Sequence, residues 1–154
     1  MKAAVQIPVA FHCHNNLYLS AGNAIAAYEN GADVLDCGLM GMARSAGNLP
    51  TEACAALMRR YGEMQDIDLY GLLSFVEKRL MPAMEPFGYH NPVAPIDLVF
   101  GLCGCHSSFL KRYQAIAEET GVNLFRLIVE TSAIDRRSPS DELIRSVAAK
   151  LPKA

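Results

Sequence analysis

Apolar residues in the first third of the chain follow two spacings, one typical of strands and one typical of helices. The apolar run at residues 5–11 predicts a buried β-strand, and residues 32–37 predict a second. Between them, residues 19–30 place apolar side chains at the i, i+3, i+4 and i+7 positions of a helix that ends at Gly31. A proline in the first turn favours another helix over residues 50–61. This β-α-β-α order is the unit of parallel sheets and (β/α) barrels.

From residue 62 onward the apolar spacing is mainly helical, and it predicts no strand. Residues 81–95 contain four prolines and no periodicity, so we expect a loop there. Ser138 and Asp141 resemble a capping box at the start of the last helix. The remaining helices are expected to begin near these residues: Asp66 or Asp68, Pro95, Ser107 or Ser108, and Leu124.

The two predicted strands are too few for an independent fold. A complete (β/α)8 barrel needs roughly 250 residues, whereas this chain has 154 and begins almost directly on a core strand. We therefore expect an α/β protein that is the carboxyl-terminal part of a barrel. Residues 1–64 would supply two to three βα units, and residues 65–154 would form an all-helical domain.

Composition excludes several classes of protein. Hydrophobic residues make up 51% of the chain, charged residues 19%, and the net charge is −2, which favours a packed core over disorder and over a nucleic-acid surface. No apolar run is long enough to span a membrane, so we expect a cytoplasmic protein. The cysteines are odd in number and lack a C-x-x-C pair, which favours reduced thiols. They are Cys13, Cys37, Cys54, Cys103 and Cys105.

Two histidines stand at alternate positions at the end of the first predicted strand. Side chains two apart on a strand share a face, so His12 and His14 project together while Cys13 points away. Two such imidazoles form half of a divalent-metal site, and a catalytic metal usually needs a third protein ligand. Taken alone, the pair is also explained by two histidines satisfied by hydrogen bonds at a strand end.

Five segments of the chain carry a family resemblance. The segments PVAFHCHNN, ADVLD and GMARSAGNLPTE, at residues 8–16, 32–36 and 41–52, resemble late-barrel motifs of the metal-dependent pyruvate aldolases and lyases. That superfamily includes 4-hydroxy-2-oxovalerate aldolase, hydroxymethylglutaryl-CoA lyase and isopropylmalate synthase. The segments DLY and GLCGCHSSFL, at residues 68–70 and 101–110, are similar to the helical carboxyl-terminal domain of the 4-hydroxy-2-oxovalerate aldolase family.

This resemblance implies a class II aldolase that cleaves 4-hydroxy-2-oxo acids to pyruvate and a short aldehyde. It implies Mn²⁺ or Mg²⁺ held by His12, His14 and an aspartate, with the metal stabilising the pyruvate enolate as a Lewis acid. In that family the aspartate, a substrate-binding arginine and a catalytic histidine base come from earlier barrel strands. We therefore expect no complete catalytic set in this chain, and little or no activity from the chain alone.

Three further residues are candidates for the substrate pocket. Asn48 occupies the position of a family asparagine near the metal, or is a turn residue at a helix entry. Arg44 would steer an anionic substrate, or is a solvated loop arginine. His106 stands where the family usually has a tyrosine that lines the substrate pocket, so it either faces that pocket or lies at a domain contact. The loop before Gly47 also has less glycine than is usual in the family.

The resemblance also implies a partner. In the aldolase family the helical domain contacts an acylating aldehyde dehydrogenase, so a hetero- or homo-oligomer is expected, with no nucleic-acid or membrane partner. Two alternatives stay open. The chain could be a non-catalytic half-barrel that only docks such a partner, or it could belong to a Claisen-type synthase or lyase that uses an acyl-CoA. The segment at residues 101–110 favours the aldolase.

Overall fold

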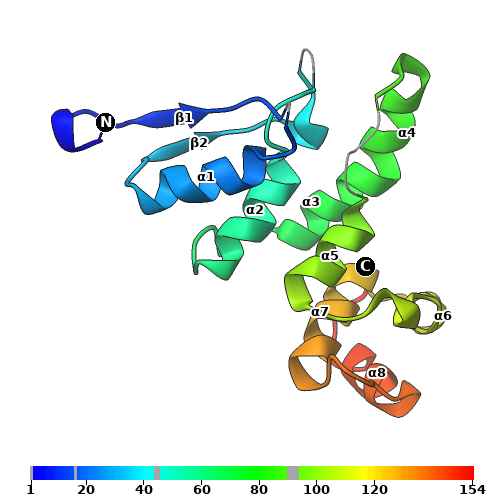
Figure 1. Cartoon of the computed structure of the whole chain (residues 1–154). Coiled ribbons are helices and arrows are strands. Elements are labelled where there is room, and N and C mark those ends of the chain that lie inside the picture. The colour runs from blue at the N-terminus through cyan, green and yellow to red at the C-terminus, as the bar shows by residue number, and fades with distance from the viewer. Residues whose placement is uncertain (1, 16, 44–45, 90–93) are drawn as a thin grey trace. The chain divides into compact units, whose positions relative to one another are not determined.

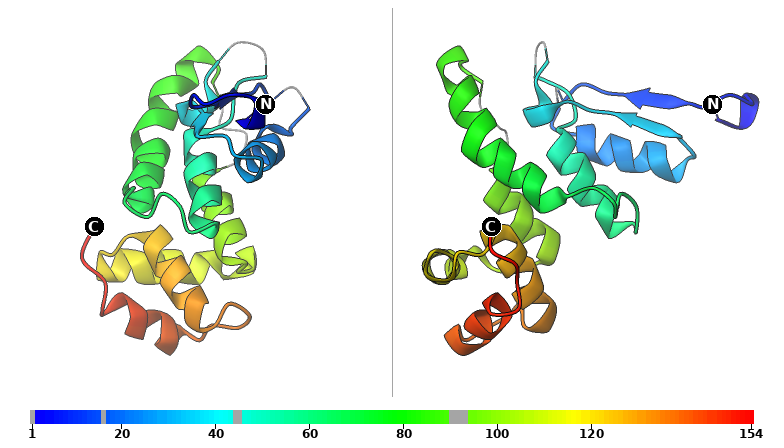
Figure 2. Two further views of the ribbon diagram at one scale, coloured as in Figure 1. Left: turned by 90° about the vertical axis from the view of Figure 1, so that its left-hand side faces the viewer. Right: turned by 180° about the vertical axis from the view of Figure 1, so that it is seen from behind.

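The computed structural model describes residues 2–15, 17–43, 46–89 and 94–154, without the side chain of Asp97. The chain forms two compact units, drawn in three orientations in Figures 1 and 2. The first unit contains residues 1–69 and 75–92, and the second contains residues 70–74 and 93–154. The functional division expected at residues 64 and 65 stays a prediction.

A small parallel sheet is the centre of the first unit. Strand β1 (Ala10–His12) pairs with β2 (Val34–Asp36), and helix α1 (Ser20–Glu29) connects them. Helix α2 (Thr51–Arg60) follows β2 and contacts α1 (Figure 1). A crossover helix is the usual way to join neighbouring parallel strands. The predicted β-α-β-α order is therefore confirmed.

The apolar face of this sheet packs on the two helices. The core cluster consists of Ala24, Leu49, Cys54 and Met58, and Leu35 of β2 packs against it. The opposite face of the sheet is uncovered, since Val34 is 50% exposed and His12 and Asp36 are exposed. An uncovered face is unusual for a parallel sheet, which is normally buried on both sides.

The first predicted strand is wrong at its start. Lys2–Ala4 form a 3-10 turn, and the strand begins only at Ala10. Lys2 donates to the Asp33 carboxylate (2.5 Å) and holds this turn beside the start of the second strand. Pro8 cannot donate to a ladder, and β2 is the only strand paired with β1 in the described part of the chain. The apolar run therefore lacks partners along most of its length.

The predicted loop at residues 81–95 is also wrong in part. Helix α3 (Leu69–Phe75) continues through a π-helical turn (Val76–Leu80) into α4 (Met81–Met84) and the 3-10 turn Glu85–Phe87. A π turn just before Pro82 is consistent with a proline in a helix, because the ring displaces the ordinary i to i−4 hydrogen bond. The part of that loop at residues 90–93 lies outside the described residues.

The second unit is built from helices that the apolar stripes predict. They are α5 (Pro95–Cys103), η5 (Ser107–Phe109), α6 (Leu110–Thr120), α7 (Leu124–Ile134) and α8 (Asp141–Ala148). Helix α7 packs against α5, α6 and α8, and its Leu127 and Ile128 are fully buried. Val122 and Lys153 form an antiparallel bridge near the end of the chain.

No helix in the described residues combines the length and the apolar character that a membrane span requires.

The start of α8 differs from the predicted capping box. Ser140 is the N-cap, and its hydroxyl oxygen accepts a hydrogen bond from the Leu143 N–H (3.2 Å). Ser138 lies two residues earlier, where its backbone N–H donates to the Asp135 carboxylate (3.1 Å). The two serines have similar sequence surroundings, but only one side chain caps the helix.

We predict that Ser140→Ala lowers the free energy of unfolding by about 1 kcal/mol, because it removes the acceptor for a helix N-terminal N–H. Ser138→Ala is the matched control and should change this free energy by less than about 0.5 kcal/mol. Urea denaturation followed by circular dichroism measures both. A larger loss in the Ser138 variant would contradict the assignment of the cap.

Candidate metal site

The parallel register brings a carboxylate beside the first histidine. His12 pairs with Asp36 across β1 and β2, and His12 Nδ1 lies 2.6 Å from Asp36 Oδ2. A carboxylate that accepts from Nδ1 fixes the ring orientation and leaves Nε2 for another partner. His12 is therefore held as metal-binding histidines in proteins usually are.

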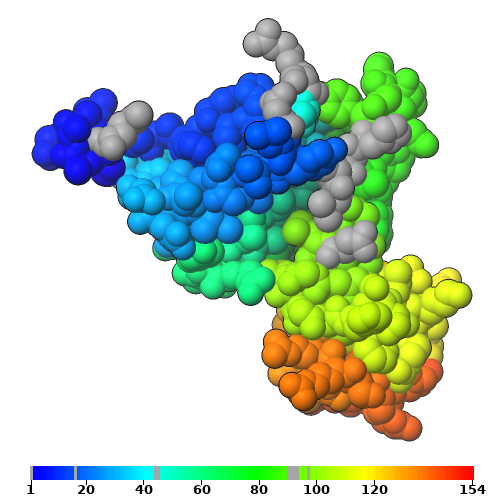
Figure 3. Space-filling view, in the orientation of Figure 1, coloured from blue at the N-terminus to red at the C-terminus, as the bar shows by residue number. Residues whose placement is uncertain are grey.

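The second histidine lies next to the first. The rings of His12 and His14 have centroids 5.2 Å apart and planes inclined by 78°. Cys13, between them, packs against the core cluster on the other side of the chain. Both imidazoles are exposed, and the blue segment that carries them lies at the surface in Figure 3. The alternation along the strand therefore predicts the relative orientation of these three side chains correctly.

A tight loop places Asn48 beside the second histidine. The backbones of His14 and Asn48 form an antiparallel bridge, and the Asn48 N–H donates to the Gly41 carbonyl (2.9 Å). Gly47 has a φ of +79°, and a Cβ at this position would lie 2.4 Å from the Gly41 oxygen. Only glycine fits there, so the Gly-Asn sequence is required by this loop.

The side chain of Asn48 has an unsatisfied oxygen. Its Oδ1 is buried and has no hydrogen-bond partner in the described part of the chain. An unmade hydrogen bond at a buried acceptor costs about 1–3 kcal/mol. An amide oxygen is also a ligand of the kind that hard divalent cations prefer.

These donors suit a divalent cation but do not enclose one. Two imidazoles and an amide oxygen are compatible with Mn²⁺ or Mg²⁺. Within the described residues, no three His, Cys, Asp or Glu side chains gather in a way that could hold a metal ion.

The other two predicted pocket residues do not belong to the described part of the first unit. Arg44 lies outside them. His106 belongs to the second unit, where it caps η5: its Nδ1 accepts from the Ser108 N–H (3.1 Å) and lies 2.9 Å from the Ser108 hydroxyl. The roles assigned to Arg44 and His106 in a substrate pocket stay predictions.

Two acidic residues near the site lie within segments that carry the family resemblance, although the sequence predicts no role for either of them. Asp36 could have been found, because the carboxyl ends of adjacent parallel strands meet at one edge of a sheet. Glu52 has no such signal. It is only 2% exposed and accepts from the Met40 N–H (3.1 Å), where Met40 has a φ of +55°. Glu52 thus supports the loop that carries Asn48.

A cysteine with a lowered pKa lies just beyond β2. Hydrogen bonds from the Cys54 thiol and the Thr51 hydroxyl lower the pKa of Cys37 below its ordinary value of 9.0, against the opposing effect of burial. The pKa of Cys54 is raised, because Cys54 is the donor to Cys37 and is buried. Cys37 is also packed against the core cluster, so its thiol is partly buried as well as hydrogen-bonded.

Comparison with known proteins gives one family. Residues 1–78 match the family model described as HMGL-like. The chain is 34% identical over 154 residues to the 4-hydroxy-2-oxovalerate aldolase of Carboxydothermus hydrogenoformans, covering 100% of this chain and 45% of the relative. The protein of the same name from Desulfitobacterium hafniense is 41% identical over 130 residues, a match that covers 84% of this chain and 38% of the relative. The one from Roseiflexus sp. is 34% identical over 153 residues, and that match covers 98% of this chain and 44% of the relative.

The chain therefore spans less than half the length of the curated relatives it matches. The match lies in their carboxyl-terminal portion. The resemblance indicated by the sequence motifs is confirmed.

We predict that Cys37 reacts with iodoacetamide at a lower pH than an ordinary thiol does. The midpoint of its alkylation rate should lie below 9.0, because the thiolate accepts hydrogen bonds that the protonated thiol cannot use as well. In Cys54→Ala the midpoint should rise, whereas Cys54→Ser keeps a donor and should retain most of the shift. Mass spectrometry of the Cys37 peptide across a pH series gives the profile. Identical midpoints in all three proteins would show that the Cys54 hydrogen bond does not cause the lowered pKa.

Proposed function

The chain belongs to the HMGL-like family, and we propose from this that it is the carboxyl-terminal part of a divalent-metal-dependent aldolase. The reaction proposed is cleavage of a 4-hydroxy-2-oxo acid to pyruvate and a short aldehyde, in line with the names of its relatives. The observation that carries the proposal is the pair of adjacent imidazoles at the end of β1, one of them braced by Asp36.

Each residue of the cluster has a role in this proposal. His12 and His14 are ligands of the cation, and Asp36 orients His12 through Nδ1. Asn48 supplies its buried Oδ1, unpartnered within the described residues, as a further ligand or as an acceptor toward a metal-bound water. When bound, Mn²⁺ or Mg²⁺ supplies a Lewis acid for the 2-oxo group and the developing enolate. The tight Gly41–Gly47 contact keeps the Asn48 amide in place.

The uncovered face of the sheet supports a barrel. His12, Val34 and Asp36 all lie on the face turned away from α1 and α2. In a closed (β/α)8 barrel that face is the interior, and side chains at the carboxyl ends of its strands form the active site. We propose that β1 and β2 are late strands of such a barrel. Its other ligands, including the aspartate, arginine and base implied by the resemblance, would come from strands outside the matched region.

The partner also remains a proposal. The resemblance of residues 101–110 points to an acylating aldehyde dehydrogenase docked on the helices of the second unit. We also propose a cytoplasmic location, because all five cysteines are free thiols, as is usual in a reducing compartment.

We predict that Asp36→Asn weakens Mn²⁺ binding by the chain about tenfold or more, because loss of a carboxylate partner to a ligating histidine typically has this effect. Electron paramagnetic resonance of free Mn²⁺ during a titration measures the affinity. His14→Ala should weaken binding at least as much, because it removes a ligand.

Asp33→Asn is the matched control for this change. Asp33 is also an exposed carboxylate next to β2, but it pairs with Lys2 and not with a histidine. Its replacement removes the same charge and should leave Mn²⁺ affinity nearly unchanged. Equal losses in the two variants would show a general electrostatic effect and contradict the role of Asp36 as the brace of His12.

We also predict that the 154-residue chain alone releases no pyruvate from 4-hydroxy-2-oxovalerate with Mn²⁺ present. An assay coupled to lactate dehydrogenase detects pyruvate, and the full-length Carboxydothermus relative is the positive control. Release that disappears in His14→Ala would overturn the view that the chain needs groups from elsewhere. Substrate-dependent release of free thiol from acetyl-CoA would instead favour the Claisen-type alternative.

A further inference from the structure

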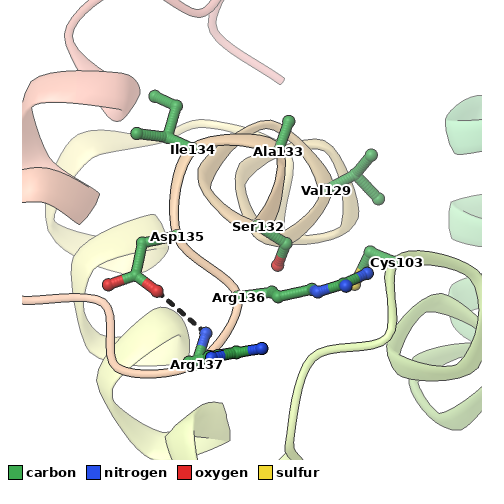
Figure 4. Close-up of a pocket in the computed structure, with 8 residues that line it drawn as sticks. All are labelled: Cys103, Val129, Ser132, Ala133, Ile134, Asp135, Arg136 and Arg137. Atoms are coloured by element: carbon green, nitrogen blue, oxygen red, sulfur yellow. Dashed lines mark hydrogen bonds between the residues drawn. The ribbon is translucent and has the colours of Figure 1, made fainter.

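A pocket in the second unit has no role in the proposed aldolase site. It has a volume of about 480 Å³ and lies between the end of α5 and the last turns of α7 with the loop that follows (Figure 4). Its walls combine cationic, hydroxyl and apolar side chains. The lining residues are Cys103, Val129, Ser132, Ala133, Ile134, Asp135, Arg136 and Arg137.

Two arginines give the pocket an excess of positive charge. Arg136 and Arg137 are exposed, and neither forms an ion pair within the described residues. In Figure 4 the Arg136 side chain extends toward Cys103. A Cβ on Gly104 would lie 3.7 Å from Arg136 Nη1, so this guanidinium reaches across to the end of α5.

The acidic residue of the pocket is already engaged. The Asp135 carboxylate accepts hydrogen bonds from the backbone N–H groups of Arg137 (2.9 Å) and Ser138 (3.1 Å). These bonds, and to a smaller extent the charge of Arg137, lower the pKa of Asp135, so its carboxylate stays ionised and offsets one of the two positive charges. The guanidinium groups keep their hydrogen-bonding capacity for a ligand.

A buried hydroxyl lies on the inner wall. Ser132 is only 6% exposed, and its Oγ makes no hydrogen bond of ordinary geometry in the described region. Figure 4 shows this hydroxyl turned toward the side along which Arg136 extends. Ser132 also lies within hydrogen-bonding reach of the Tyr113 phenol, whose pKa burial raises to about 12. A hydroxyl has one donor and two acceptor positions, so Ser132 retains capacity toward the pocket even beside that phenol.

We propose that this pocket binds a phosphorylated small molecule. The two guanidinium groups outweigh the single Asp135 carboxylate, and each presents a fork of N–H donors that matches the oxygens of a phosphate group. The Ser132 hydroxyl would donate to a third phosphate oxygen. The pocket is much larger than a phosphate group, and Val129 and Ala133 provide an apolar wall for the organic part of the ligand.

The simplest competing explanation is structural. Arg136 could serve only to bind the carbonyl groups at the end of α5, where a cation is favourable, and Ser132 could be an unsatisfied core residue. This explanation predicts no selective affinity for phosphate, so ligand binding separates the two.

The test uses isothermal titration calorimetry on the 154-residue chain with adenosine monophosphate, adenosine and inorganic phosphate as probes. We expect adenosine monophosphate to bind at least about tenfold more tightly than adenosine, because only the nucleotide carries the phosphate. Inorganic phosphate should also bind less tightly than the nucleotide, because it does not use the apolar wall. Equal affinities for adenosine and its monophosphate would overturn the proposal. Equal affinities for phosphate and the nucleotide would overturn the role of the apolar wall.

Variants locate the binding. The double substitution Arg136→Gln with Arg137→Gln should weaken nucleotide binding about tenfold or more, whereas Lys111→Gln with Lys150→Gln is the matched control. Both lysines are exposed residues of the same unit, and their replacement removes the same charge. Equal losses in the two double variants would indicate nonspecific attraction and overturn the site.

Ser132→Ala tests the buried hydroxyl. Removing an unsatisfied hydroxyl should leave the melting temperature unchanged or raise it, so failure to fold does not obscure the result. We expect about threefold weaker nucleotide binding in this variant. Unchanged affinity would remove Ser132 from the site. None of these measurements depends on aldolase activity, so they succeed or fail independently of the proposed function.

Discussion

The parallel pairing of β1 with β2 is the constraint on which the candidate metal site depends. It aligns His12 with Asp36 in register, so the hydrogen bond between them needs no loop or helix to bring the residues together. A slip of one residue would turn Asp36 to the other face of the sheet. Leu35, which packs on the core cluster, fixes the register by the same alternation. The burial of an apolar side chain therefore determines where the carboxylate points.

The second constraint is backbone contact in the loop before α2. Neither Gly41 nor Gly47 has room for a side chain: a Cβ on Gly41 would lie 2.8 Å from the Asn48 carbonyl oxygen, and a Cβ on Gly47 would lie 2.4 Å from the Gly41 carbonyl oxygen. These close contacts and the hydrogen bond from the Met40 N–H to the buried Glu52 stabilise the loop, in which Asn48 forms a backbone bridge with His14. Asn48 is then placed by the backbone alone. Its amide oxygen is buried and has no hydrogen-bond partner among the described residues.

Much of this arrangement is readable in the sequence, and the exceptions have physical causes. Alternation along β1 predicts that His12 and His14 share a face, and the helices follow from apolar stripes that are buried in the structure. The predicted start of β1 is wrong, because an apolar run forms a strand only where it has a partner. The local sequence does not show whether Ser138 or Ser140 caps the helix, because the cap depends on one hydrogen bond, from the Leu143 N–H to the Ser140 hydroxyl. No local sequence pattern predicts the unsatisfied Asn48 and Ser132 oxygens, because tertiary packing determines whether a hydrogen-bond donor lies near them.

Those unsatisfied oxygens connect the two proposed sites by a common argument. A buried acceptor or donor without a partner costs about 1–3 kcal/mol, a substantial part of the stability of an ordinary domain. Such a group indicates the type of ligand when the side chains around it favour ligands of the same charge. Asn48 Oδ1 lies in a loop bridged to His14, next to a histidine braced for metal binding. Ser132 Oγ lies at the wall of a pocket with two arginines that form no ion pair within the described residues. In the first case the neighbours are suited to a cation and in the second to an anion. The same observation, a buried oxygen without a hydrogen-bond partner, therefore supports a cation as the ligand in the first unit and an anion in the second.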